Sequence, residues 1–217
     1  MFHFLSFTNA RVTNARVTNA APQAQFTELL PGDIVTVRSV FQGLSARSRY
    51  LRFHAARPQL PLPMQRRLAD VRPGGHEAHV ATLGDRAIGI ARWIRDTEDP
   101  RDAELAIEVI DAAQSGGIGR QLAAHAARSA RAAGVQCFLA YIDEANQDLR
   151  ARILACGATV DQYDPSLLRL PVCSLLQALE SPYPDNAASA RHSRDVLSRK
   201  SGPNGERAST MTHFQQE

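Results

Sequence analysis

A short run of small and polar residues, Gln114-Ser115-Gly116-Gly117-Ile118-Gly119, lies between two segments of different pattern. Residues 104–110 before it read as a strand, and residues 118–133 after it form an alanine-rich helical run. A strand, a glycine-containing loop and a helix aim backbone N–H groups at an anion, because glycine permits close approach and the helix N-terminus carries roughly half a positive charge. The sequence therefore predicts a site for a phosphate-bearing ligand.

The spacing of the glycines excludes two common nucleotide-binding loops. The dinucleotide fingerprint G-x-G-x-x-G fails because Leu122 stands at its third glycine, and the P-loop fails because the run contains no lysine. The order Q-x-x-G-x-G after a strand resembles the pyrophosphate-binding loop of the GNAT superfamily of acyl-CoA-dependent N-acyltransferases. An ordinary strand-to-helix turn is the alternative, since glycines are common at turns.

The resemblance implies which groups would hold acetyl-CoA. The pantetheine arm would pair with the backbone of Val109 and Ile110, and Gln114 would stand at the start of the loop. Asn146 would help to place the pantetheine, with capping of the helix that follows as the alternative. The pyrophosphate would meet the backbone N–H groups of Ser115, Gly116, Gly117, Gly119 and Arg120.

Two glutamates on the strand before the loop could act as the general base. Acyl transfer needs a neutral amine, whereas a free lysine has a pKa of about 10.4, so a carboxylate must take the proton directly or through water. The sequence Ala103-Glu104-Leu105-Ala106 resembles the strand start at which lysine acetyltransferases carry this glutamate. Glu104 is therefore the expected base, with a strand-edge carboxylate paired to an arginine as the alternative. Glu108 lies on the same strand face and is the second candidate.

The remaining steps of acyl transfer are assigned less fully. A backbone N–H near Val109 would stabilise the tetrahedral oxyanion. Many GNAT members place a tyrosine general acid seven residues after the asparagine, and this chain has Ile153 there. The thiolate either leaves unaided, because a thiol has a pKa near about 8.5, or receives a proton from Tyr141 or a water.

Hydrophobic spacing and turn residues predict the elements around these groups. The order β-α-α-β-β-β-α-β-α-β-β is that of GNAT proteins. The expected fold class is α/β (α+β): a mixed, mostly antiparallel central sheet with helices on both faces and a splay between the fourth and fifth strands. The predicted strands are 34–40, 78–83, 87–94, 104–110, 135–142, 158–163 and 167–172, and the predicted helices are 41–54, 63–71, 118–133 and 147–156.

Two further segments carry the resemblance, which covers residues 34 to 172. Leu44 to Phe53 resembles the first-helix signature of bacterial protein lysine acetyltransferases. Asn146, with Gly157 and Ala158 at the spacing N-x10-G-[FA], resembles the helix that follows the fifth strand of the family.

Seven arginines and a single acidic residue, Asp70, lie between positions 41 and 73. They form either a solvated helical face or an electrostatic footprint for an acidic partner or a CoA phosphate. No nucleic-acid-binding motif is present, so nucleic acid is not an expected partner. His76 and His79 are three apart on a strand and face opposite sides, so no metal is expected. The arginines are Arg47, Arg49, Arg52, Arg57, Arg66, Arg67 and Arg72.

Composition and the chain ends set the expected organisation. The 217 residues with 44% hydrophobic content suit one domain with a sizeable core. Residues 1–25, which repeat TNARV, and residues 177–217 are expected to be disordered, with the acyltransferase domain at 26–176. No apolar run reaches the roughly 18 residues of a membrane helix. The cysteines Cys137, Cys156 and Cys173 are expected to be buried thiols of a reducing compartment, so the cytoplasm is the expected location.

The sequence thus predicts an enzyme that moves an acetyl group from acetyl-CoA to a primary amine, with a protein lysine as the favoured acceptor. A small-molecule amine acceptor is the first alternative. A non-catalytic acyl-CoA-binding sensor is the second. The acceptor, the acyl-chain preference and the oligomeric state are not specified by the sequence.

Overall fold

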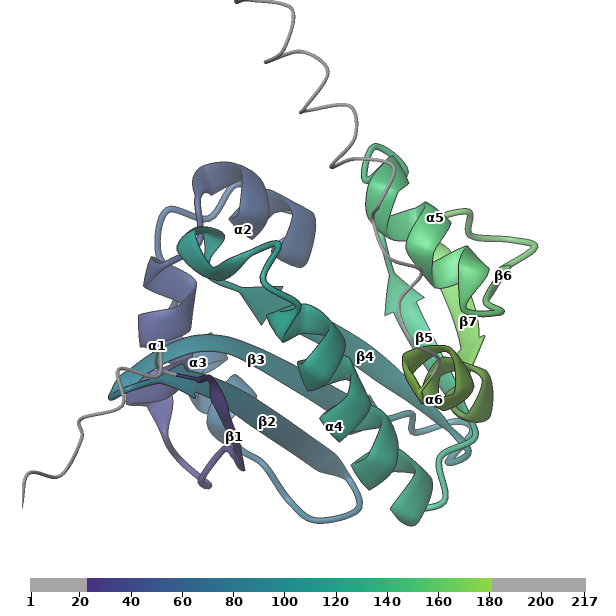
Figure 1. Cartoon of the computed structure of the whole chain (residues 1–217), viewed down its shortest axis with the longest axis horizontal. Helices are drawn as coiled ribbons and strands as arrows, with labels where there is room; N and C mark the ends of the chain where they lie inside the picture. The colour runs from purple at the N-terminus through teal and green to yellow at the C-terminus, as the bar shows by residue number, and fades with distance from the viewer. Residues whose placement is uncertain (1–22, 181–217) are drawn as a thin grey trace, which may run out of the picture. The chain divides into compact units, whose positions relative to one another are not determined.

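Within residues 23–180, seven strands form one sheet in the order β1-β2-β3-β4-β5-β7-β6 (Figure 1). The computed structural model describes residues 23–180, so the expectations for residues 1–22 and 181–217 lie outside the described part. Neighbouring strands pair antiparallel except β4 and β5, which are parallel, and the predicted mixed sheet is confirmed. The strands are β1 Gln25–Glu28, β2 His76–Leu83, β3 Arg86–Arg95, β4 Asp102–Val109, β5 Cys137–Tyr141, β6 Thr159–Val160 and β7 Leu167–Pro171.

Helices cover both faces of the sheet, as two adjacent residues of β3 show. The Trp93 indole N–H donates to the Ser129 hydroxyl of α4 (Ile118–Ala132) at 2.8 Å. The Arg92 guanidinium donates to the Leu68 carbonyl of α3 (Leu62–Ala69) at 2.5 Å. Consecutive strand residues face opposite sides, so α3 and α4 lie on opposite faces. The sheet-facing side of α4 is mostly alanine, which lets the helix lie close to β2, β3 and β4.

The first predicted strand is wrong. Residues Ile34–Gln42 form helix α1, and the first strand of the sheet is Gln25–Glu28. The Asp33 carboxylate caps α1 by accepting from the Thr36 N–H at 3.0 Å, and Val37, Val40 and Phe41 are buried at helical spacing. A short apolar run is compatible with both the helical and the strand period, so the spacing alone did not distinguish them. The cap at Asp33 favours the helix.

The long helix predicted at 41–54 is also wrong, because Gly43 divides it. Helix α1 ends at Gln42, and α2 (Ala46–Phe53) begins afresh with the Ser45 hydroxyl accepting from the Ser48 N–H at 3.2 Å. A Cβ at Gly43 would lie 2.4 Å from a side-chain carbon of Ile110. The chain therefore passes close to the end of β4 only because this residue is glycine.

The expected C-terminal boundary of the domain also needs correction. Residues Val172–Glu180 form helix α6, which continues past the expected domain end at residue 176. Its residues Leu175 and Leu176 are buried in the core. The expected burial of all three cysteines is wrong as well, because Cys173 is exposed and the other two are half-buried.

The pairing of β4 with β5 stops early. It runs over Asp102↔Cys137, Ala103↔Phe138 and Glu104↔Leu139, and then the two strands separate (Figure 1). The rest of β4, from Leu105 to Val109, continues to pair with β3 on its other edge. This is the predicted splay, and it leaves one edge of β4 open.

Candidate active site

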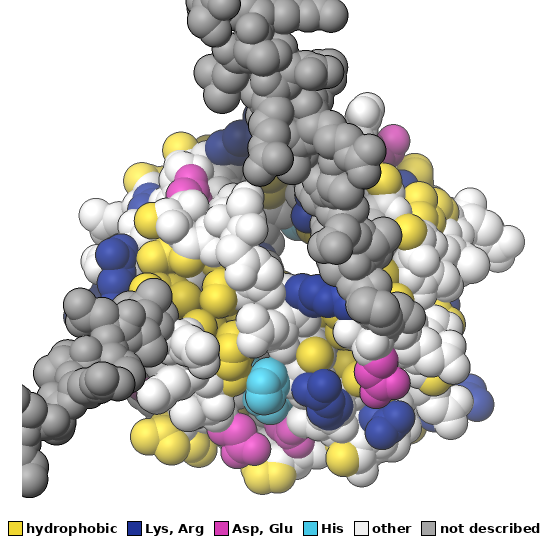
Figure 2. All heavy atoms as spheres, viewed as in Figure 1, with side chains coloured by type: hydrophobic (Ala, Val, Ile, Leu, Met, Phe, Trp, Pro, Cys, Tyr) yellow, Lys and Arg dark blue, Asp and Glu magenta, His cyan; other side chains and the backbone are white. Residues whose placement is uncertain are grey.

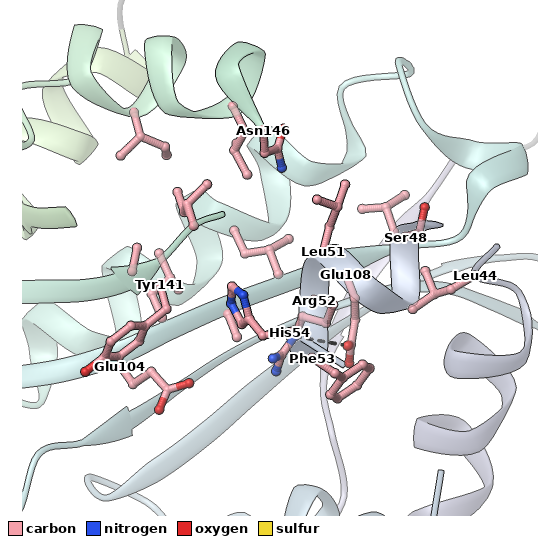
Figure 3. Close-up of a pocket in the computed structure, with 18 of the residues that line it drawn as sticks. Leu44, Ser48, Leu51, Arg52, Phe53, His54, Glu104, Glu108, Tyr141 and Asn146 are labelled. Atoms are coloured by element: carbon pink, nitrogen blue, oxygen red, sulfur yellow. Dashed lines mark ion pairs between the residues drawn. The ribbon is translucent and has the colours of Figure 1, made fainter. Parts of the chain in front are cut away.

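The gap between β4 and β5 widens into a cavity of about 530 Å³. Its walls come from β4, the end of β5, α2 and one side of α5 (Gln147–Ala155), as Figure 3 shows. The labelled side chains that carry charge or hydrogen-bonding groups there are Ser48, Arg52, His54, Glu104, Glu108, Tyr141 and Asn146 (Figure 3).

The open edge of β4 presents backbone groups to this cavity. The Ile110 N–H donates to the Ile88 carbonyl of β3 at 2.9 Å, and the Ile110 side chain is buried. Because backbone groups alternate between the two edges of a strand, those of Ile107 and Val109 face the gap. The Val109 N–H therefore faces the gap, where a pantetheine arm is predicted, and the Val109 carbonyl accepts from Gln114. The expectation for Ile110 is wrong, since its N–H already serves the β3 pairing.

The side chain of Gln114 links the two ends of the loop after β4 by hydrogen bonds. The Gln114 amide donates to the Val109 carbonyl at 3.0 Å and to the Asp111 carboxylate at 3.3 Å. A short 3-10 helix, Asp111–Ala113, precedes it, and Ser115 follows with φ of +66°. Gln114 thus fixes the turn that carries the chain from the end of β4 to the start of α4.

Gly117 and the first turn of α4 form the part of the loop suited to an anion. Gly117 precedes α4 with φ of +77°, and a Cβ there would meet no heavy atom within 4 Å, so the space before it is open. The N–H groups of Ile118 and Gly119 belong to a first helical turn, which has no intrahelical acceptors. Gly116 and Gly119 leave their sides of the loop without side chains. Such a turn favours negative charge through its N–H groups and the helix dipole.

Arg120 has a second role beside its backbone position in this turn. Its guanidinium donates to the carbonyls of Ala178 and Leu179 at 3.1 and 2.6 Å. These carbonyls lie in the last turn of α6, where a cation is favourable. The side chain therefore joins the start of α4 to the end of α6.

Glu108 is the centre of a buried ion-pair cluster. One carboxylate oxygen lies 3.2 Å from Arg92 Nη2, and the other lies 3.3 Å from Arg52 Nε. The side chains of Glu108 and Arg92 are 5% and 2% exposed. Burial lowers the pKa of Arg92, and the adjacent Glu108 acts against that shift. One oxygen of Glu108 is thus hydrogen-bonded to Arg92, and the other is in ion-pair contact with Arg52 without a hydrogen bond.

Glu104 has a different setting. It is the last residue of β4 that pairs with β5, and its side chain is exposed. Figure 3 shows its carboxylate beside Tyr141, apart from the Arg52–Glu108 pair. Within residues 23–180 no ion pair engages it, so the alternative of a carboxylate paired with an arginine is not seen.

Helix α2 has no fully buried residue, and beside the packing of Phe53 against Phe41 it is attached to the site by polar contacts. The Ser45 N–H donates to the Asp111 carboxylate at 3.2 Å, and hydrogen bonds from Ser45 and Ser48 lower the pKa of Asp111. Arg49 donates to the Pro58 carbonyl at 2.8 Å and lies over the Phe41 ring. The wall of the cavity thus depends on the loop that follows β4.

The arginine-rich segment 41–73 is therefore not a simple solvated face. Arg49 and Arg52 hold α2 in place, whereas Arg47 is exposed. On the face drawn in Figure 2, dark-blue side chains stand at separated places with acidic side chains among them.

Asn146 and Ile153 both line the cavity. The Asn146 side chain makes no capping hydrogen bond to α5, so the capping alternative is wrong. Ile153 shows that the position expected for a tyrosine acid is apolar. Tyr141 lines the same cavity and is 46% exposed.

Two cavity residues were missed from the sequence as site residues. Arg52 was counted only within the basic run, and His54 was not considered. His54 ends α2 in the left-handed conformation, with φ of +50°, and its ring points into the cavity (Figure 3). The available signal was a histidine at a helix end four residues before Pro58, where the chain must leave the helix.

Two absences concern residues 23–180 alone. No group of three or more His, Cys, Asp or Glu side chains there could hold a metal ion. None of the helices in this range has the length and apolarity needed to cross a membrane.

The chain is similar to known acyltransferases. A model of the acetyltransferase (GNAT) family matches residues 45–157. The GNAT domain of S. lividans PAT matches over 68% of this chain and 89% of that chain, with 26% identity and a TM-score of 0.62. The match to a cAMP-binding acyltransferase from Mycobacterium smegmatis covers 81% of this chain and 51% of that protein, with 24% identity and a TM-score of 0.50. The match to a GNAT-family acetyltransferase from Streptococcus pneumoniae covers 69% of this chain and 99% of that protein, with 15% identity and a TM-score of 0.54. The last two likenesses concern the fold alone.

Glu108→Gln is expected to destabilise the protein. It would leave Arg52 and Arg92 without a counter-charge, and removing one partner of a buried ion pair costs about 3–5 kcal/mol. Exposed glutamates should matter little, so Glu104→Gln and the loop variant Glu98→Gln should stay within about 0.5 kcal/mol of the parent. The free energy of unfolding of the parent and of the three variants is measured by urea denaturation. Equal stability of Glu108→Gln and Glu98→Gln would show that the cluster does not hold α2 to the sheet.

Gly117→Glu is expected to abolish binding of acetyl-CoA, measured by calorimetric titration. The substitution places a side chain and a negative charge before the first turn of α4, where the pyrophosphate would lie. Gly84→Glu is the matched control, because Gly84 also has a positive φ and open space but lies in the β2–β3 hairpin. It should bind as the parent does. Equal affinities for parent and Gly117→Glu would remove the loop from the site.

Proposed function

The chain belongs to the acetyltransferase (GNAT) family, and on that premise we propose that it transfers an acetyl group from acetyl-CoA to a primary amine by direct attack, with Glu104 as the general base. The observation that carries the proposal is the open edge of β4 that leads directly into an anion-suited loop. A pantetheine arm needs main-chain partners along its length, and a pyrophosphate needs N–H donors at its end. The two features lie in that order along residues 107–119.

The order of groups along β4 sets the positions of the two substrates. With the pyrophosphate at the first turn of α4 and the pantetheine along Val109, the thioester lies further back along β4, toward Glu104. A backbone N–H of this open edge would stabilise the oxyanion, because a fixed donor there needs no reorganisation during the reaction. The acceptor amine would enter between α2 and β5.

Glu104 is the proposed base because its carboxylate is exposed to the cavity and free of ion pairs within the described residues. It would take one proton from the ammonium of the acceptor, directly or through water, and the freed lone pair of the nitrogen attacks the acetyl carbon. The C–S bond then breaks and its electron pair leaves with the CoA sulfur, while the second N–H proton passes to water and so to solvent or to the thiolate. Glu108 is a poor alternative, since a proton on its carboxylate would remove the counter-charge of two arginines.

The leaving thiolate has two proton sources in this proposal. Tyr141 lines the cavity beside Glu104 (Figure 3), and a water could serve equally. Ile153 offers no proton. Because a thiol has a pKa near about 8.5, the thiolate can also leave without an acid.

A protein lysine is the favoured acceptor in this proposal. Its support is the resemblance of residues 44–53 and 103–106 to lysine acetyltransferases, together with 26% identity to the GNAT domain of S. lividans PAT. A small-molecule amine is the alternative acceptor, and an acyl-CoA sensor without turnover is the alternative function. Release of CoA thiol from acetyl-CoA, measured against panels of proteins and small amines, separates these three.

Glu104→Gln is expected to lower turnover at neutral pH by about 10²- to 10⁴-fold, because glutamine keeps the size but cannot accept a proton. The loss should shrink between about pH 6.5 and 9.5, since more of the acceptor amine is already neutral as pH approaches its pKa. Acetyl-CoA affinity should be nearly unchanged.

The control is Glu98→Gln, an exposed glutamate outside the cavity, which should retain parental turnover. Near-parental turnover of Glu104→Gln at neutral pH, with chemistry rate-limiting, would exclude this glutamate as the base. Binding of acetyl-CoA without turnover on any acceptor would favour the sensor.

A further inference from the structure

The charges around the cavity are unequally paired. Two guanidinium groups, of Arg52 and Arg92, share the single carboxylate of Glu108. The cluster therefore carries one more positive than negative charge. Among the residues that line the cavity, Glu104 is the only other acidic side chain.

Arg52 is the most exposed member of the cluster. Its side chain is 18% exposed, whereas those of Glu108 and Arg92 are nearly fully buried. Its Nε faces Glu108, and its guanidinium carbon lies 4.8 Å from the centre of the Phe53 ring. Within residues 23–180 no hydrogen bond engages its two terminal nitrogens, although the buried Arg92 uses both of its own. Figure 3 shows His54 beside it, between the Arg52–Glu108 pair and Glu104.

The reaction changes this balance. An acceptor amine arrives as an ammonium and, under the proposed function, meets Glu104. Glu104 then no longer offsets the excess positive charge of the cluster. A charge in a partly enclosed cavity is costly unless it is paired. The arrangement thus calls for a negative group on the Arg52 side of the same substrate.

We infer that the terminal nitrogens of Arg52 bind a carboxylate carried by the acceptor, so that the substrates are primary amines with a carboxylate near the amine. The guanidinium edge matches a carboxylate with two parallel N–H donors. His54, with a ring at the same wall, can donate a further hydrogen bond. A free amino acid and a lysine with an acidic neighbour both satisfy this chemistry. The inference rests on the proposed function, because it takes Glu104 as the partner of the amine.

The test uses acceptor pairs that differ only in one carboxylate. Free lysine is compared with lysine amide, and a lysine peptide with a neighbouring glutamate is compared with the same peptide carrying glutamine. Each acceptor is assayed for kcat/KM with acetyl-CoA and for binding by calorimetry in the presence of CoA. The two pairs separate a small-molecule acceptor from a peptide.

The variants are Arg52→Gln, Arg52→Lys and the control Arg38→Gln, an exposed arginine of α1 outside the cavity. In Arg52→Gln, Glu108 keeps Arg92 as its partner, so the cluster becomes neutral and the fold should persist with a lowered melting temperature. A cooperative melting transition that still rises on adding acetyl-CoA checks this.

The parent should prefer the carboxylate-bearing member of at least one pair by about 10- to 100-fold, the typical worth of a charge-assisted contact. Arg52→Gln should lose that preference, mainly through a raised KM for the carboxylate-bearing member, so that kcat/KM becomes similar for the two members of a pair. Arg52→Lys should keep part of the preference for the carboxylate-bearing acceptor, and Arg38→Gln should keep the full preference.

Equal affinity of the parent for both members of each pair, or the same preference in Arg52→Gln, would overturn the inference. So would a dependence on Arg52 only when succinyl-CoA replaces acetyl-CoA, because the carboxylate would then belong to the acyl group. The calorimetry decides the inference even without turnover. Absence of turnover on every acceptor contradicts only the proposed function.

Discussion

The candidate site depends on the early end of the pairing between β4 and β5. β4 pairs with β3 from Ala103 to Val109, and β5 pairs with β7 along its whole length, from Cys137 to Tyr141. Because β4 stays paired with β3 and β5 stays paired with β7, the two strands β4 and β5 separate from each other beyond Glu104 and Leu139. Unpaired strand edges are normally a liability, since they invite pairing with another chain. Here the open edge lines a cavity, and its backbone groups are available to an extended ligand.

Helix α2 closes this cavity although none of its residues is fully buried. Phe53 packs against Phe41 and the edge of the core, and polar links add the pair Arg52–Glu108, the contacts of Arg49 and the hydrogen bond from Ser45 to Asp111. Asp111 and Gln114 belong to the loop that leads to α4. The cavity wall formed by α2 and the loop before α4 are thus joined by polar groups. The cluster of Glu108 with two arginines that supports this wall leaves one excess positive charge beside the cavity.

Much of the fold could be predicted from the sequence, because the central elements carry strong signals. The β2–β3 hairpin, the loop at Gln114–Gly119 and the alanine-rich face of α4 are each marked by local residues. The prediction of a strand at residues 34–40 failed because this run fits both the strand and the helical period. The residue that caps the helix, Asp33, lies outside the run. Helix α6 was missed because its burial depends on contacts with the distant α4.

The site was predicted less completely than the fold. Main-chain positions could be taken from the loop, but Ile110 was misplaced because strand alternation shows only when the partner strand is known. The roles of Arg52 and His54 depend on where α2 ends and on what lies opposite, which no local pattern specifies. Glu104 and Glu108 look equivalent along the strand. They differ because Arg52 of α2 and Arg92 of β3 form ion pairs with Glu108 and not with Glu104.

The central claim is that the open edge of β4 holds the arm of acetyl-CoA, and residue-resolved amide hydrogen exchange by NMR tests it most directly. Saturating acetyl-CoA should slow exchange at Ile107 and Val109, whose N–H groups face the gap, and at the first turn of α4. The amides of Ala106 and Glu108, which face β3, should change little. If acetyl-CoA binds and exchange at Ile107 and Val109 is unaffected, the arm does not lie along this strand and the account is wrong.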